Sequence, residues 1–481
     1  MIEIELIPLI ILVPLLWASL AFIAGPAHGW KLALGGSTLQ LVLAWRLAAE
    51  VGGGADRVHV PGGWEAPLGI ALSADGLAAV MLLLAQGVAL PLAFYARAYF
   101  ARHPEGAHTF WPLTGFLLAA MNALFLSADI FNLYVTLELV GLAAVGLVAS
   151  GGAGSVAAAL RYLLATLLGS GSYLLGVALL YGAYGTVTLP ELASQVTEAS
   201  PPVAMLAAGL MLAGMAVKTA LFPFHFWLPP AHGGAPSPVS ALLSALVIKA
   251  SFYLAARLWL ALFLPLATPS WGQVIGVLGA AAIFWGSFMA LRQARLKMLI
   301  AYSTVAQVGY LFLFFPLATH TEPAAAQSAL QGVTLQALAH GLAKAAMFAA
   351  AGAVILSTGH DRIMQLGGIT AHMPVTVFTL AIAGVSLMGL PPSAGFLAKW
   401  LLIDSAIVSG QWWWIVVMIA GGLLTAAYVF KVLRHAFLRA EQSEVYKPLP
   451  RLVEWPGFLL AVASLALGLR AAELLNVLGT P

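Results

Sequence analysis

The sequence contains no cysteine among its 481 residues, and this absence removes several kinds of site. Disulfides, thiolate-bound zinc and cysteine-ligated iron–sulfur clusters cannot be built from this chain. Charge is also scarce, because Asp, Glu, Lys and Arg make up 8% of the residues, against about 25% in a soluble domain. With 62% hydrophobic residues and a net charge of +3, the chain needs lipid as solvent and gives no basis for nucleic-acid binding.

Apolar runs of span length recur along the whole chain, divided by short breaks of polar residues or of Gly and Pro. The first run, from Leu6 to Ala24, has no basic segment before it and is interpreted as a membrane helix, not a cleaved signal. The longest polar interruption, 50–70, is predicted to be an external loop. The pattern predicts an all-α integral membrane protein with about fourteen transmembrane helices. The expected spans are 4–24, 30–49, 74–96, 109–127, 129–149, 158–184, 203–222, 237–260, 271–290, 297–316, 331–357, 374–402, 410–434 and 453–471.

Lysine and arginine residues are distributed unequally between the two sets of loops that this helix count defines. Thirteen fall on the side of the first loop, whereas Arg46, Arg57, Arg257 and Arg470 fall on the other. The positive-inside rule makes the richer side cytoplasmic and places both termini on the non-cytoplasmic side. The thirteen are Lys31, Arg97, Arg102, Arg161, Arg292, Arg295, Lys297, Arg362, Lys431, Arg434, Arg439, Lys447 and Arg451.

Six of the ionisable residues within the predicted spans stand out as candidates for function, because charged side chains are costly there. A lysine at the centre of a bilayer costs about 2.5–3.5 kcal/mol on insertion scales, so it needs a partner or water and indicates a function. Burial disfavours the charged form of an amine and a carboxylate neighbour favours it, so moving one charge can make the next amine gain or lose a proton. The sequence therefore predicts a proton or cation relay. Its expected members are Glu138, Lys218, Lys249, His340, Lys344 and Lys399.

Two of these lysines stand beside predicted helix breaks. Pro223 follows Lys218, and proline removes a backbone donor from the helix. Around Lys399 the order is opposite, since the Gly- and Pro-rich segment 389–395 comes first. Opposite order in two corresponding helices is what inverted-topology repeats produce. The expected division is 1–108 for helices one to three, 109–260 for a first repeat of five helices, 271–434 for a second, and 435–481 for a charged amphipathic segment and the last helix.

Each buried charge also has a purely structural alternative. Glu138 and Lys218 could form an ion pair that joins two helices. Lys399 could extend to the membrane interface, and Lys249 could hydrogen-bond a neighbouring helix. His340 and Lys344 share one helix face by their i, i+4 spacing, but Lys344 could lie near a helix end.

Some polar residues outside this set have simpler interpretations. His225 and His232 flank two prolines and are expected to have a capping or loop role. Asp75 opens the third helix and is expected to partner its N-terminus. The sequence assigns no role to Asp129 or Asp404.

Three stretches together resemble the signature of the proton-translocating antiporter-like family. They are KTALFPFHFWLPPAHGGAPSPVS from Lys218, QARLKMLIAYS from Gln293 followed by QVGY, and GLPPSAGFLAKW from Gly389. That family includes the antiporter-like subunits of complex I, the A-type and D-type subunits of Mrp cation/proton antiporters, and related membrane hydrogenase subunits. The likeness covers roughly 70–435.

The resemblance implies fourteen core helices in inverted repeats, with the seventh and twelfth helices broken. Arg295 departs from the acidic residue that many members carry in this loop, which puts the local contacts of the loop in doubt. The length of the chain disfavours the largest complex I subunit. The motif after Lys218 and the presence of Lys249 suit a D-type Mrp antiporter subunit, a middle complex I subunit or a hydrogenase-type homologue, and the D-type group is favoured among them. The positions that match the family's functional residues are Glu138, Lys218, Lys249, His340, Lys344 and Lys399, where some members carry glutamate at the last position and others lysine.

The favoured function is a membrane subunit that translocates protons, or exchanges a cation for protons, within a multisubunit complex of the cell (inner) membrane. Its expected partners are other membrane subunits, protons and, as an open alternative, Na⁺. The other hypotheses are a stand-alone secondary solute transporter, a complex I-type NADH:quinone oxidoreductase membrane subunit, and a structural subunit without transport. No nucleotide-binding glycine motif occurs, so no cofactor or metal is expected, and redox chemistry in a hydrogenase-like or NADH:quinone oxidoreductase-like complex would belong to partners.

Overall fold

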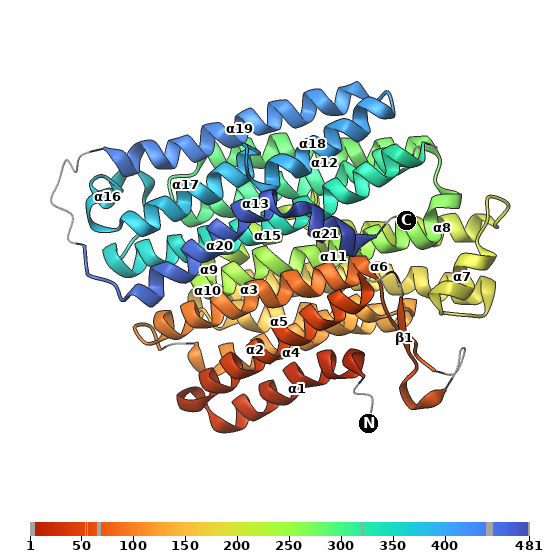
Figure 1. The fold of residues 1–481 in the computed structure, drawn as a ribbon, viewed down its shortest axis with the longest axis horizontal. Coiled ribbons are helices and arrows are strands. Elements are labelled where there is room, and N and C mark those ends of the chain that lie inside the picture. Colours follow the sequence, from red (N-terminus) through yellow and green to blue (C-terminus); the bar gives the residue numbers. More distant parts are fainter. Residues whose placement is uncertain are drawn as a thin grey trace.

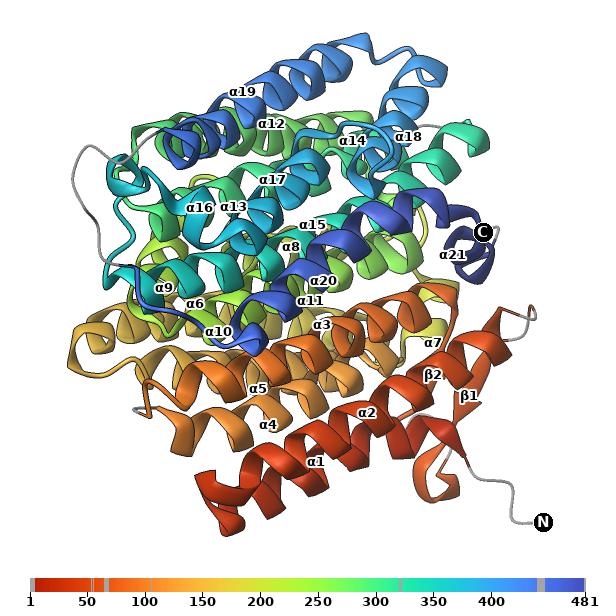
Figure 2. The same ribbon diagram turned by 60° about the vertical axis from the view of Figure 1, so that its left-hand side comes forward.

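The computed structural model describes residues 5–52, 54, 56–64, 69–104, 106–319, 322–438 and 446–479. In two views the long helices run side by side along one common direction (Figures 1 and 2). This arrangement suits a chain that crosses a bilayer, because backbone polar groups in hydrocarbon must be bonded within the protein.

Twelve helical segments of the described chain are long and apolar enough to cross a membrane, and each overlaps one predicted span. The other two predicted spans, 203–222 and 374–402, contain the shorter apolar helices α8 (Pro202–Lys218) and α17 (Pro374–Met388). The prediction of an all-α membrane fold is confirmed, while the count of fourteen crossings stays a prediction. The other main helices are α1 (Leu6–Ala24), α2 (Pro26–Val51), α3 (Gly76–Phe100), α4 (Ala107–Leu126), α5 (Ile130–Ala149), α6 (Val156–Tyr184), α11 (Ile248–Leu258), α12 (Pro269–Arg292), α13 (Leu296–Phe312), α15 (Pro323–Thr358), α18 (Ala394–Val408), α19 (Trp412–Phe437) and α20 (Arg451–Leu469).

Short helices connect or extend the long ones. A π-helical turn at Leu243–Val247 joins α10 (Ser237–Leu242) to α11, so the two form one nearly continuous helix. Such turns are rare and occur often at functional sites. The remaining short helices are α7 (Leu189–Gln195), α9 (Leu228–Gly234), α14 (Phe314–Ala318), α16 (Ile369–His372) and α21 (Ala471–Leu478).

Two helices are interrupted where the sequence predicts breaks. After α8 the chain turns through Ala220, whose φ of 55° lies in the left-handed region, and continues through Phe224–Trp227 into α9. Between α17 and α18, Gly389 adopts a φ of 80°, a conformation that glycine tolerates at helix C-termini. Both interruptions leave backbone carbonyls at membrane depth without helical partners.

The external loop predicted at 50–70 contains part of a small hairpin. Strand β1 (Arg57–His59) pairs antiparallel with β2 (Leu72–Ala74), with Val58 opposite Ser73. Strands of three residues carry too little periodicity to be predicted, so the sequence missed them. Of the charged segment expected after the thirteenth span, 439–445 lie outside the described residues and 446–450 are not helical.

A cluster of uncharged amides holds the first four helices together. Pro14 lacks the N–H that would bond the Ile10 carbonyl, and Asn122 Nδ2 donates to that carbonyl at 2.7 Å. Asn122 also bonds Gln40 at 3.1 Å and accepts from Gln86 at 3.0 Å. Buried amides of this kind join helices where no hydrophobic effect drives their association.

Candidate functional site

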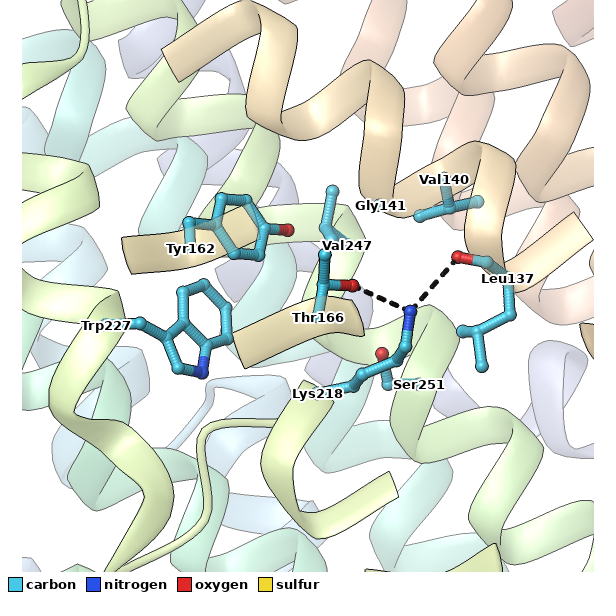
Figure 3. A pocket seen from close by; sticks show the side chains of 9 residues that line it. All are labelled: Leu137, Val140, Gly141, Tyr162, Thr166, Lys218, Trp227, Val247 and Ser251. Atoms are coloured by element: carbon cyan, nitrogen blue, oxygen red, sulfur yellow. Dashed lines mark hydrogen bonds between the residues drawn. The ribbon is translucent and has the colours of Figure 1, made fainter. Parts of the chain in front are cut away.

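The first ionisable pair joins α5 to the end of α8. Lys218 Nζ lies 3.4 Å from Glu138 Oε2. The same amine donates to Thr166 Oγ1 at 2.7 Å (Figure 3). Ser170 donates a second hydrogen bond to Glu138 Oε2, whereas Glu138 Oε1 has no partner among the described residues. The Glu138 side chain is 17% exposed and Lys218 is buried, so the structure brings two predicted site residues into contact inside the bundle.

A small cavity lies between this pair and the next helix. Its volume is about 10 Å³, and Thr166, Lys218, Trp227 and Ser251 are among its lining residues (Figure 3). A cavity that holds one water molecule needs roughly 10–15 Å³ of space for the centre of a water-sized sphere, so this cavity is about large enough for one water. Because Ser251 belongs to α11, as does Lys249, the cavity lies on the way from the first pair to the second lysine.

Two further lysines, Lys249 and Lys344, are fully buried, and each lies near the middle of its helical span, Ser237–Leu266 and Pro323–Thr358 respectively. Lys249 Nζ donates to the carbonyl of Ser244, in the π-helical turn. Lys344 Nζ donates to the Ile300 carbonyl at 2.9 Å and to the Ser303 hydroxyl. Neither amine forms an ion pair within the part of the chain that the structure describes.

Hydroxyl groups connect these two lysines. The Ser244 hydroxyl lies 3.0 Å from Thr304 Oγ1. The Thr304 hydroxyl in turn donates to the Ile300 carbonyl at 3.1 Å. The same carbonyl accepts the bond from Lys344. Polar atoms of α13 therefore bridge Lys249 on one side and Lys344 on the other.

Two buried histidines lie among the same amines. Both ring nitrogens of His340, and both of His232, have no hydrogen-bond partner in the described structure. Each ring interacts electrostatically with Lys249 and Lys344. The expectation of a capping or loop role is wrong for His232, because its ring is buried and caps nothing, whereas His225 lies nearer the surface and accepts a bond from Trp285 at 3.0 Å.

Lys399 lies just beyond the second helix break. Its Nζ donates to the carbonyls of Leu387 at 2.8 Å and Met388 at 3.0 Å, which are the last residues of α17. The amine also lies 4.5 Å from the centre of the Tyr310 ring. The negative end of a helix and the face of an aromatic ring both stabilise a cation, so this site holds a charge without a carboxylate.

Side chains of α13 and α19 connect the centre to the α18 lysine. Gln307 Nε2 lies 3.4 Å from the Leu387 carbonyl and 3.4 Å from Thr425 Oγ1. The Leu387 carbonyl also accepts the hydrogen bond from Lys399. The Tyr428 hydroxyl lies 3.3 Å from Thr425 Oγ1. It also interacts with Ser303, whose hydroxyl accepts a hydrogen bond from Lys344. Closely spaced polar groups thus extend from α15 to α18.

Lys297 is a residue that the sequence placed among the loops and the structure buries. Its side chain donates to the Ala235 carbonyl, and its backbone N–H donates to Asp361 at 3.1 Å. Arg295 Nε bonds the same carboxylate at 2.8 Å, which explains why a basic residue is accommodated in this loop. Lys297 opens an apolar run within the 293–310 motif, and this was the signal for its burial. It interacts with His232, so it extends the buried polar set toward one face.

The aspartates differ in their roles. Asp75 caps α3 by accepting from Ala78 at 2.9 Å, as expected, and also pairs with Arg257, which the sequence had counted among the basic residues of the non-cytoplasmic side. Burial opposes ionisation of Asp75, but the guanidinium outweighs it, so the pKa of Asp75 lies below its usual value. Asp129 caps α5 by accepting from a backbone N–H at 2.6 Å, and Asp404 accepts from a serine hydroxyl at 3.0 Å.

The sequence and the fold of this chain are similar to those of known membrane subunits. Residues 127–425 match the family described as NADH:quinone oxidoreductase/Mrp antiporter, TM. The chain is 38% identical over 387 residues to the N subunit of NADH-quinone oxidoreductase from Desulforudis audaxviator, covering 78% of this chain and 74% of that protein. It is 31% identical over 438 residues to the D subunit of the Na⁺/H⁺ antiporter from Alkalihalophilus pseudofirmus, covering 90% and 87%. A chain of the Mrp complex from a Dietzia species superposes with a TM-score of 0.89 at 26% identity, covering 98% and 96%.

Proposed function

The chain belongs to the NADH:quinone oxidoreductase/Mrp antiporter transmembrane family, and we propose that it translocates protons, or exchanges a cation for protons, as one membrane subunit of a larger complex. The observation that carries this proposal is the line of buried amines from Lys218 to Lys399, with polar groups in the gaps. Relatives named as antiporter and quinone-oxidoreductase subunits support the same activity.

The carriers in this proposal are the amines and one imidazole. While Glu138 contacts Lys218, the charged amine is favoured; when they separate, Lys218 can release its proton toward the cavity and Lys249. Among the described residues no carboxylate pairs with Lys249 or Lys344, so a charge on one amine disfavours a charge on the other and drives the proton onward. His340, whose two ring nitrogens bond no group in the described part of the chain, can accept a proton on one nitrogen and release it from the other.

Replacement of Lys218 tests the relay. In the whole complex reconstituted in liposomes, Lys218→Ala is expected to abolish proton uptake while the complex still assembles. The control is Lys431→Ala, because Lys431 is a lysine whose Nζ likewise bonds protein groups, the carbonyls of Leu291 and Gln293 at 2.7 Å each, but it lies outside the line. Proton uptake at the wild-type rate in the Lys218→Ala complex would contradict the relay.

The orientation in the membrane is part of the proposal. Helix α1 begins and α21 ends toward one end of the bundle, away from the opposite end, where α16 lies and α19 ends (Figure 1). The unequal distribution of basic residues supports a cytoplasmic location for the end of the bundle where α16 lies. Because the chain has no cysteine, single-cysteine variants can test this with a membrane-impermeant maleimide. Arg102→Cys should react only in inside-out vesicles and Ser194→Cys only in right-side-out vesicles; the reverse labelling would invert the topology.

A further inference from the structure

A stripe of polar side chains runs along α15 at a spacing of four residues. From the buried centre toward the start of the helix it consists of Lys344, His340, Gln336, Gly332 and Ser328. Residues four apart are neighbours on the surface of a helix, so this α15 stripe is continuous except at the glycine. It leads from the middle of the bundle to the first turns of α15.

Two buried glutamines connect the α15 stripe to the lysine of α18. Gln336 Nε2 donates to Gln307 Oε1 at 2.9 Å. Gln307 Nε2 lies 3.4 Å from the Leu387 carbonyl, which accepts the hydrogen bond from Lys399. The last amine of the proposed relay is therefore linked to the middle of the α15 stripe.

The outer end of the α15 stripe meets a carboxylate. Ser328 Oγ donates to Asp404 Oδ2 at 3.0 Å, and Asp404 is half-buried. Asp404 precedes the end of α18 by four residues and Ser328 follows the start of α15 by five, so both lie within about 6–8 Å of a helix end. Helix α19 follows α18 and ends where α16 lies, so α18 ends toward the opposite end of the bundle, where α1 begins (Figure 1). We call this the outer end.

Close packing separates the two parts of the α15 stripe. A Cβ at Gly332 would lie 3.0 Å from the Ala398 carbonyl oxygen and 3.0 Å from atoms of Leu402, on α18. Leu402 is fully buried, and a close apolar contact leaves no room for water. Gln336 and Ser328 lie about 12 Å apart along the helix axis, so a proton crosses this gap when water enters between α15 and α18.

We propose that Asp404 is the outermost carrier of the relay and releases the transported proton at the outer end. The proton leaves the Lys399 ammonium, which becomes a neutral amine, and adds to a carboxylate oxygen of Asp404 through the water admitted at Gly332. It then passes to solvent, and the carboxylate regains its charge. The proposal rests on the transport function proposed above.

Two observations favour a carrier over a structural role for this carboxylate. No lysine or arginine among the described residues forms an ion pair with Asp404, so it is not held by a charged partner. Acidic residues inside membrane helices are costly, and they mark proton relays when they face the interior of a bundle. Asp404 faces α15 through its bond with Ser328.

The first test measures proton uptake by the whole complex in liposomes. Asp404→Asn should slow uptake by at least about tenfold, since positioned proton donors and acceptors contribute about 10²–10⁴-fold to a rate. Asp404→Glu keeps a carboxylate and should restore most of the rate. Ser328→Ala leaves the carboxylate in place and should slow uptake far less than Asp404→Asn. Equal losses in Ser328→Ala and Asp404→Asn would show that the residue only joins two helices, and would overturn the proposal.

The matched control is Glu191→Gln on α7, which lies toward the same end of the bundle (Figure 1). Glu191 is also half-buried and also accepts from a hydroxyl group, that of Thr186, but it lies outside the α15 stripe. This variant should transport at the wild-type rate. A loss as large as that of Asp404→Asn would mean that any carboxylate at this end affects transport, and would overturn the proposal.

A chemical test separates the carboxylate from the fold. Because the chain has no cysteine, Asp404→Cys provides a single thiol in it. A methanethiosulfonate that attaches a carboxylate should restore proton uptake, whereas one of equal length that attaches a hydroxyl should not. The same reagents on the complex with the wild-type chain correct for cysteines of other subunits. Restoration by both reagents or by neither would overturn the proposal.

The outcomes also distinguish this proposal from the function on which it rests. Uptake at the wild-type rate in Asp404→Asn, together with its loss in Lys218→Ala, would overturn the role of Asp404 and leave the relay in place. A wild-type complex that takes up no protons would overturn both.

Discussion

Lys218 and Lys399 both lie beside a break in a helix, yet different chemistry holds their charges. Lys218 ends α8, before its break, and its amine contacts the Glu138 carboxylate at 3.4 Å. Lys399 follows its break, and its amine bonds the last carbonyls of α17 and lies over the Tyr310 ring. One charge depends on the carboxylate of a side chain and the other on the fixed dipoles of a helix end and an aromatic ring. We infer that side-chain motion can switch the first site, whereas the second responds to the geometry of its break.

The strongest way to break this comparison is to remove the anion. Glu138→Gln keeps a group for Ser170 to bond but leaves Lys218 without its carboxylate. Transport should be lost, and the free energy of unfolding should fall by about 3–5 kcal/mol, because a buried charge becomes unpaired. Thermal unfolding of the purified complex and proton uptake in liposomes would measure the two effects.

A double variant separates stability from transport at this pair. Glu138→Gln with Lys218→Met removes both charges, so stability should recover while transport stays lost. If the single and double variants unfolded at the same temperature, the pair would not carry opposite charges in the folded protein.

At the second break, Lys399→Met should abolish transport with a much smaller loss of stability. No anion is left unpaired, and only two helix-end carbonyls lose a donor, so the unfolding free energy should change by about 1–3 kcal/mol at most. The measurement is the same pair of assays. A destabilisation as large as that of Glu138→Gln would show that an unrecognised anion faces Lys399.

The ion pair between Arg295 and Asp361 offers a contrast, because it has only a structural role in this scheme. Asp361→Asn should lower stability by about 1–3 kcal/mol, since Arg295 and the backbone N–H of Lys297 lose a charged acceptor. Transport per assembled complex should stay near the wild-type rate. A specific loss of transport, after correction for the amount of complex, would place Asp361 in the ion path.

The smallest expected effect concerns the Tyr310 ring. Tyr310→Phe keeps the aromatic face under the Lys399 amine, so transport should change little. Tyr310→Leu removes a cation–π contact of about 0.5–2 kcal/mol and should slow transport by several-fold. Initial rates of proton uptake for the two variants would decide; equal rates would mean that the ring only fills space.

Much of the membrane fold could be predicted because the signals are local. Apolar runs predicted the helices, and the prolines and glycines near Lys218 and Lys399 predicted both breaks. The burial of the His232 and Lys297 side chains was not predicted, because burial depends on contacts that are not local in the sequence. Each stands at the edge of an apolar run, where sequence cannot tell whether a neighbouring helix will cover it.

Composition and the spacing of apolar residues by themselves determined that this chain is an integral membrane protein with amines inside its helices. Tertiary structure alone decided which of those amines meet a partner. Glu138 and Lys218 are 80 positions apart and Asp75 and Arg257 are 182 apart, yet both pairs are in contact. The physical reason is that hydropathy belongs to a single segment, whereas a contact depends on how two distant helices pack.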